Sequence, residues 1–274
     1  IYNALMASLK ADASQIAKYS PLEGWRHEGE EQCGMHINCC NANGPRAFAM
    51  IPQFAYQVQD DCVRVNFYAP SEAELVLPGK KPVRLKQTTD YPRTDQIEIE
   101  VDPAKETAFT IALRIPAWSK IAVVSVNGQP QDGVLQGAYL PVNRKWKKGD
   151  RITVKLDLRA RLVERNQAQA IVRGPVVLAR DSRFGDGFVD EASVVVSKDG
   201  YVELTPVKTP GFAWLAFTAP MVLGTDLESN RAPKQIHFCD FASAGNTWDK
   251  TQRYRVWLPK TLNVMHSPYR PYNQ

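Results

Sequence analysis

Apolar and polar residues alternate with a period of two from about residue 54 onward, which is typical of half-buried β-strands. Turn signals separate the alternating runs, as in Ala69-Pro70-Ser71, and Asn127-Gly128 predicts a two-residue hairpin turn. Many short strands at regular spacing favour an antiparallel sandwich or barrel. In the first half, the predicted strands cover residues 54–57, 63–68, 74–77, 83–87, 96–101, 108–115, 122–126, 137–141 and 151–158.

The alternation breaks near residues 164–169 and then starts again. Gly174-Pro175 interrupts the first run of this second set, which predicts an edge or a bend at that point. We place a domain boundary at residue 160, so residues 56–160 and 161–274 form two antiparallel β-sandwich domains. In the second half, the predicted strands cover residues 170–178, 192–196, 201–206, 213–218, 234–241 and 254–258.

The first residues of the chain show a helical pattern instead. Tyr2, Leu5, Met6 and Leu9 fall on one stripe of a helix over residues 1–18, which has no capping residue before it. We therefore expect the chain to be part of a longer protein. A polar loop is predicted over residues 19–45, followed by a short helix that ends before Pro52.

Composition and charge exclude several classes of protein. Hydrophobic residues make up 44% of the 274 residues and charged residues 23%, which are ordinary globular values. The net charge of +5 is spread over interspersed lysine, arginine, aspartate and glutamate residues, so no nucleic-acid footprint is predicted. No run approaches the roughly 18 apolar residues of a membrane span, and no membrane association is expected.

The cysteines are the most informative polar residues. The chain has five, Cys33, Cys39, Cys40, Cys62 and Cys239, and this odd, clustered set does not suggest a disulfide scaffold. We interpret Cys62 and Cys239 as small buried apolar residues. Cys39 and Cys40 are either buried thiols or thiolates in a zinc site completed by other ligands, and a metal-held thiolate can act as a nucleophile.

Several residues near the cysteine pair carry groups that could bind a polar substrate. His36, Asn43 and Arg46 are candidates, although Asn43 also suits a turn and Arg46 a helix surface. His237 is expected to pack within a strand. No glutamate in the chain stands out as a general acid. We expect the six tryptophans to pack mostly in the sandwich cores or between domains rather than to stack on sugars.

Taken together, these segments resemble glycoside hydrolase family 127, the β-L-arabinofuranosidase family and its close relatives. The resemblance begins with INCCNANGPRAFAMIPQFAY and continues, in order, through VNFYAPSEAEL, LRIPAWSKIAVVSVNGQP, YLPVNRKWKKGDRITVKLDL, AIVRGPVVLARD and RYRVWLP. These motifs extend over most of the chain. The double cysteine and the RIPAWS, VNG, WKKGD and RGP series are specific in combination.

The resemblance implies a mainly β chain in which residues 1–55, the end of an (α/α)6 helical barrel with the Cys39-Cys40 active-site loop, precede two β-sandwiches. It implies a retaining, exo-acting hydrolase of β-L-arabinofuranosides or related plant sugars, in which Cys39 is the nucleophile. It also implies Zn²⁺ held by Cys39 and Cys40, with a glutamate and a third cysteine from upstream, where a second glutamate acts as acid and base. We therefore expect residues 1–274 alone to be inactive.

Two other functions are compatible with these residues. A carbohydrate-binding sandwich pair would bind sugar without depending on Cys39, and a structural zinc protein would lose its fold on chelation. The sequence leaves the oligomeric state open, including a homo-oligomer. It also leaves the compartment open between bacterial periplasm and cytoplasm.

Overall fold

The computed structural model describes residues 39–165, 167–224, 232–245 and 253–261. The predicted helix over residues 1–18 and the predicted loop up to residue 38 lie outside this range. The chain divides into two compact units between Leu158 and Arg159, whereas the sequence places the boundary at residue 160. The described residues are mainly β with several antiparallel sheets, as predicted.

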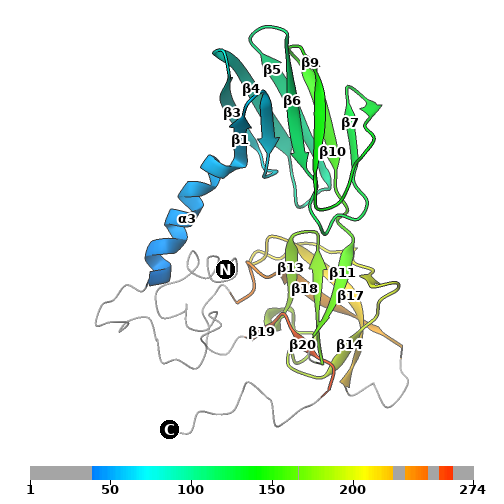
Figure 1. Cartoon of the computed structure of the whole chain (residues 1–274). Coiled ribbons are helices and arrows are strands. Elements are labelled where there is room, and N and C mark those ends of the chain that lie inside the picture. The colour runs from blue at the N-terminus through cyan, green and yellow to red at the C-terminus, as the bar shows by residue number, and fades with distance from the viewer. Residues whose placement is uncertain (1–38, 166, 225–231, 246–252, 262–274) are drawn as a thin grey trace. The chain divides into compact units, whose positions relative to one another are not determined.

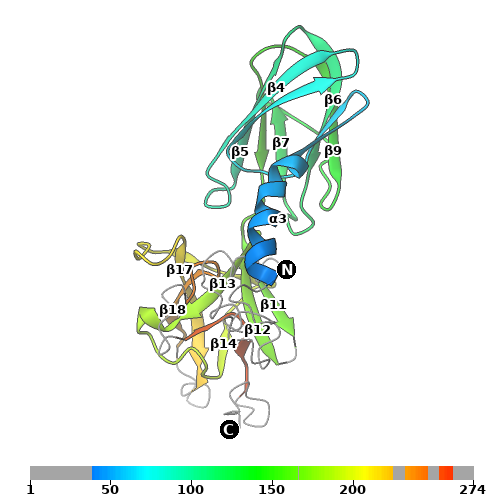
Figure 2. The same cartoon turned by 90° about the vertical axis from the view of Figure 1, so that its left-hand side faces the viewer.

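The first unit is a sandwich of two sheets, seen in Figure 2 with β4 and β5 on one side and β6 and β9 on the other. Neighbouring strands are antiparallel except β2 and β6, which are parallel. One sheet has the order β1 (Tyr56–Gln59), β2 (Cys62–Val65), β6 (Thr107–Arg114), β9 (Tyr139–Trp146). The other has the order β3 (Ser71–Leu77), β4 (Lys81–Thr89), β5 (Gln96–Pro103), β10 (Asp150–Lys155), β7 (Val123–Val126), β8 (Gln129–Pro130).

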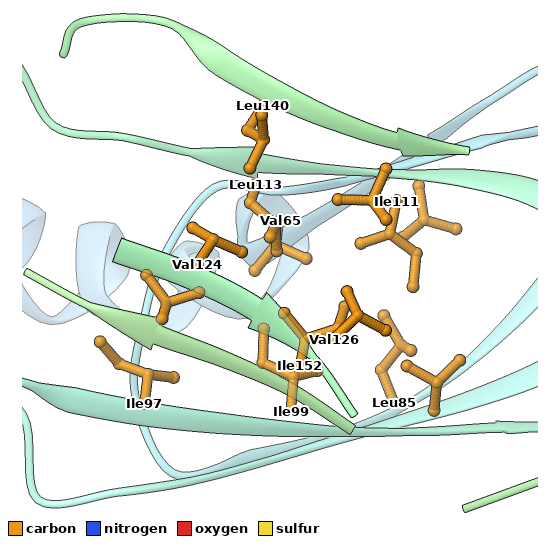
Figure 3. Packing of buried hydrophobic residues seen from close by; sticks show 14 of the residues in the cluster. Val65, Leu85, Ile97, Ile99, Ile111, Leu113, Val124, Val126, Leu140 and Ile152 are labelled. Atoms are coloured by element: carbon orange, nitrogen blue, oxygen red, sulfur yellow. The ribbon is translucent and has the colours of Figure 1, made fainter. Parts of the chain in front are cut away.

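The core of this unit follows from the period of two. In β5, Ile97, Ile99 and Val101 are fully buried, while the alternate residues Glu98 and Glu100 face outward. Buried apolar side chains of β2, β6 and β9 pack against them from the opposite sheet (Figure 3). The predicted hairpin at Asn127-Gly128 is confirmed, because both residues have positive φ and Val126 pairs with Gln129.

The second unit has its own core between antiparallel strands, with contributions from Ile171, Phe217 and Phe238. The predicted bend at Gly174-Pro175 is instead a tight hairpin in which Arg173 pairs with Val176, and Gly174 supplies the positive φ of 55°. The strand order is β14 (Ser193–Val195), β17 (Ala216–Leu223), β18 (Lys234–Asp240), β13 (Val176–Asp181), β12 (Ala168–Arg173), β11 (Ala160–Arg165), β15 (Tyr201–Val202). Attached to it are β16 (Thr205–Pro206), β19 (Tyr254–Arg255), β20 (Leu258–Pro259) and the 3-10 helix η1 (Ser182–Phe184).

The segment around the cysteine pair differs from the sequence prediction. A single helix, α3 (Cys39–Ala55), covers residues 39–45 of the predicted loop, the predicted short helix and the start of the predicted strand at residue 54. Figure 1 shows α3 leading directly into β1. The turn propensities of Asn43-Gly44 and the breaking tendency of Pro52 are local preferences, which the surrounding structure can override. The Cys39-Cys40 loop prediction is therefore wrong, since both residues begin a helix.

Candidate functional site

The cysteine pair lies in α3. Cys39 and Cys40 are the first residues of this helix among those that the structure describes. Both cysteines therefore belong to the helix that leads into the first sandwich.

Three of the predicted site residues share one stripe of this helix. Cys39, Asn43 and Arg46 follow each other at intervals of four and three residues, and such positions lie on the same face of a helix. Arg46 is exposed, and the side chains of the other two lie outside the described part. His36, the fourth predicted residue, also lies outside the described residues. The helix thus groups two predicted substrate contacts with the predicted nucleophile.

The C-terminal half of α3 carries large apolar side chains at its surface. Met50, Ile51 and Phe54 are 40%, 43% and 54% exposed. A surface helix of a globular protein normally turns such residues toward other structure. Among the described residues, no helix is long and apolar enough to span a membrane.

The donor set for a metal is incomplete within the described residues. That part of the chain contains no group of three or more His, Cys, Asp or Glu side chains able to hold a metal ion. A tetrahedral zinc site uses four ligands, of which Cys39 and Cys40 could supply two. Cys62 is a half-buried free thiol and Cys239 a fully buried one, so the predicted packing role is confirmed for Cys239.

The sequence motifs that follow the cysteine pair are structural in the first unit. Ser119 of the RIPAWS motif is fully buried, and its Oγ accepts a hydrogen bond from the backbone N–H of Asp157 at 2.8 Å. Trp146 of the WKKGD motif is also fully buried, with its indole N–H donated to the Phe109 carbonyl at 3.0 Å. These motifs therefore hold the sandwich together.

Asp150, which ends the WKKGD motif, organises a buried polar cluster. Its carboxylate accepts hydrogen bonds from the Lys147 backbone N–H at 3.0 Å and from Asn127 Nδ2 at 2.8 Å. Arg144 lies 3.7 Å away. Burial would raise the pKa of Asp150, but these hydrogen bonds and the Arg144 charge together hold the pKa below its usual range. The ionised carboxylate therefore ties the 147–150 turn to the Asn127 hairpin.

We expect Asp150→Asn to destabilise the first unit by about 1–3 kcal/mol at pH 7, because an amide replaces an acceptor that serves two donors. A lowered folded-state pKa adds stability above the unfolded-state pKa, and that stability is lost as the pH falls through the folded-state value. The difference between wild type and variant should therefore shrink below about pH 4. Urea unfolding at pH 7 and pH 3 measures this, with Asp132→Asn at an exposed position as the control. An equal difference at both pH values would contradict it.

In the second unit, the strand after the RGP motif ends in buried charges. Arg180 has no exposed surface, and its guanidinium lies 3.7 Å from Glu191 and 3.9 Å from Asp186. Burial lowers the pKa of Arg180, while the two carboxylates act in the opposite direction. Asp181 accepts hydrogen bonds from Arg183 and from the Gly245 N–H. The sequence pattern did not indicate a role for these residues, because the segment LARD is typical of the end of a strand.

His237 and the tryptophans have mostly packing roles. The ring of His237 stacks on Phe184 with centroids 5.1 Å apart, and its backbone N–H bonds to Asp186, which confirms the predicted packing role. Trp146 is core, as predicted, but Trp214 and Trp257 are 39% and 42% exposed. Trp25 and Trp248 lie outside the described residues.

The first sandwich is similar to a domain of a known protein family. Residues 62–158 match the family described as β-L-arabinofuranosidase, GH127 middle domain. A GH127 β-L-arabinofuranosidase from Geobacillus stearothermophilus T6 has a similar structure, with a TM-score of 0.69 and 21% identity over 88% of this chain and 41% of its own. A structure described as a glycoside hydrolase has a TM-score of 0.66 and 25% identity over 81% and 39% of the two chains. A GH127 β-arabinofuranosidase has a TM-score of 0.65 and 24% identity over 83% and 39%.

Residues 62–158, which form most of the first sandwich, are thus similar to the middle domain of a family of glycoside hydrolases. The match and the similar structures are consistent with membership of glycoside hydrolase family 127. The chain spans about two fifths of the length of the structures that it resembles. None of the curated proteins matches it significantly.

Proposed function

We propose that the protein containing this chain is a retaining, exo-acting glycoside hydrolase with a cysteine nucleophile. Its substrates are β-L-arabinofuranosides or a related sugar of plant polysaccharides. One observation carries the proposal: a GH127 middle domain directly follows a helix that begins with two adjacent cysteines. The structural neighbours described as arabinofuranosidases support the choice of sugar.

In this mechanism the thiolate of Cys39 attacks the anomeric carbon of the sugar, while a carboxylic acid outside this chain protonates the departing oxygen. The C–O bond breaks as the C–S bond forms, which leaves a thioglycoside on Cys39. The same carboxylate then deprotonates a water molecule, whose oxygen replaces sulfur at the anomeric carbon and restores the thiolate. Two inversions give net retention.

Cys39 and Cys40 would hold a zinc ion together with donors from elsewhere in the protein. Bound zinc keeps a coordinated thiol deprotonated at neutral pH, which is the state that a nucleophile needs. His36, Asn43 and Arg46 would bind sugar hydroxyls, and the stripe position of Asn43 and Arg46 beside Cys39 supports this role.

The complete protein tests the proposal. It should hydrolyse nitrophenyl β-L-arabinofuranoside, give the β-anomer first by proton NMR, and contain about one zinc per chain. Sugar affinity without turnover would favour the carbohydrate-binding module instead. Zinc whose removal unfolds the protein, with no effect on any sugar, would favour the structural zinc protein.

We further expect residues 1–274 alone to turn over none of this substrate. We expect the glutamate that acts as acid and base, and the remaining metal ligands, to lie outside this chain, which covers 41% of the similar arabinofuranosidase structure. A nitrophenol release assay on the isolated chain, beside the complete protein at equal concentration, measures this. A turnover rate above the buffer blank would contradict the assignment of those residues.

A further inference from the structure

Asn66 connects the end of α3 to the first sandwich. It directly follows β2, and its backbone N–H donates to the Ala55 carbonyl at 2.9 Å. Its side-chain Nδ2 donates to the Phe54 carbonyl, also at 2.9 Å. Both acceptors belong to the last turn of α3, whose carbonyls have no partner within the helix. Asn66, at the end of β2, therefore caps the C-terminus of α3.

Two further side chains hold Asn66 in place. Arg114 of β6 donates from Nε to the Asn66 carbonyl at 2.6 Å, and the Tyr139 hydroxyl of β9 donates to Asn66 Oδ1 at 2.5 Å. Arg114 and Tyr139 are themselves paired across the β6–β9 ladder. All the polar groups of Asn66 are thus used, two toward the helix and two toward the sheet.

A second contact fixes the residue that follows the helix. The Tyr56 hydroxyl accepts a hydrogen bond from Gln87 Nε2 at 2.7 Å and lies 2.9 Å from Ser71 Oγ. Gln87 is only 3% exposed and also donates to the Phe67 carbonyl at 3.0 Å. The path from α3 into β1 is therefore held on both sides of Ala55.

We infer that Asn66 is a positioning residue for the reaction. Through Asn66, the first sandwich holds in place the helix that contains Cys39 and Cys40. This inference rests on the proposed function. A helix of 17 residues is about 25 Å long, so a tilt of about 3° at Ala55 moves its far end by about 1 Å. A displacement of that size can cost about 100-fold in rate.

The variant Asn66→Asp separates the contact of this side chain with the helix from its contact with the sheet. It keeps an acceptor for Tyr139 but removes the donor to the Phe54 carbonyl and places a negative charge at the helix C-terminus, which is unfavourable there. Asn127→Gly is the matched control, because Asn127 also bonds through both side-chain atoms in the same sandwich, but its partners are Asp150 and Arg151 rather than α3. Its positive φ is kept by glycine.

Hydrogen exchange of residues 1–274 is the first measurement, and it does not depend on activity. We expect Asn66→Asp to speed exchange in the last turn of α3 about tenfold, while Asn127→Gly leaves that turn unchanged. Equal exchange in all three proteins would overturn the inference. So would faster exchange in α3 from both variants, because the effect would then reflect general loss of stability.

Turnover by the complete protein is the second measurement. With wild type active, Asn66→Asp should lower kcat at least tenfold at unchanged zinc content, Asn127→Gly should stay within about twofold, and Asn66→Gln, whose longer amide can still reach the helix end, should recover part of the loss. Normal kcat in Asn66→Asp would overturn the positioning role. An inactive wild type would refute the proposed function alone, and hydrogen exchange would still decide whether Asn66 holds α3.

Discussion

Replacing Cys39 by alanine in the complete protein is expected to lower the turnover of nitrophenyl β-L-arabinofuranoside by at least about 10⁴-fold. Removal of a covalent nucleophile leaves only binding and the acid group, and losses of this size are typical of nucleophile variants. Alanine has the highest helix propensity of all residues, so this replacement is compatible with the helical backbone at Cys39. The melting temperature should therefore change little.

The matched control is Cys62→Ala, which removes a free thiol from β2 of the first sandwich without touching α3. It should keep wild-type kcat and zinc content. Cys40→Ala should lose both zinc and activity, whereas Cys39→Ala should lose activity by more than it loses zinc. Comparable turnover by wild type and Cys39→Ala would remove the nucleophile from the proposed mechanism, even if zinc were present.

Strands with strict alternation were predictable from the sequence for a simple physical reason. A strand such as β5 buries every second side chain, so the apolar positions record its location and its inner face directly. The Asn127-Gly128 turn was equally clear, because few residues accept two successive positive φ angles. The arrangement of strands into sheets was not predictable, since β2 pairs in parallel with β6, and the paired residues, such as Cys62 and Thr110, are far apart in the chain.

The start of α3 could not be predicted, because its residues have low helix propensity. Asn43, Gly44 and Pro45 are typical of a turn, and the polar and apolar positions of this short segment alternate too weakly to show a helical period. The role of Asn66 was hidden for a different reason. Its partners at Phe54, Arg114 and Tyr139 are far away in sequence, and only the sheet brings them together.

In the sequence, only the adjacent cysteines pointed to the candidate site. Adjacent thiols suggested a metal-held nucleophile, and the helix adds that Asn43 and Arg46 share a stripe with Cys39. The other motif residues carried the family resemblance for structural reasons. Ser119, Trp146 and Asp150 are buried groups that need specific hydrogen-bond partners, so a sandwich of this type requires them at fixed places.

This requirement makes Trp146→Ala the substitution with the largest expected effect on stability. The indole is fully buried in β9, lies against the Phe109 ring with centroids 5.9 Å apart, and has the Arg144 guanidinium 5.2 Å from its centroid. Truncation leaves a cavity in the centre of the first sandwich and removes the partner of the Phe109 carbonyl. We expect a loss of about 3–5 kcal/mol in the free energy of unfolding of the first unit.

The two units provide an internal reference for this measurement. Hydrogen exchange in increasing urea should show the strands of the first unit opening earlier in Trp146→Ala, while those of the second unit keep their wild-type protection. Trp257→Ala, which truncates a side chain that is 42% exposed in the second unit, should change the exchange of either unit by much less. Trp146→Phe keeps most of the buried ring and loses only the N–H donor, so it should fall between wild type and Trp146→Ala. If Trp146→Ala destabilised the first unit no more than Trp257→Ala destabilises the second, the motif tryptophan would not be the centre of the core.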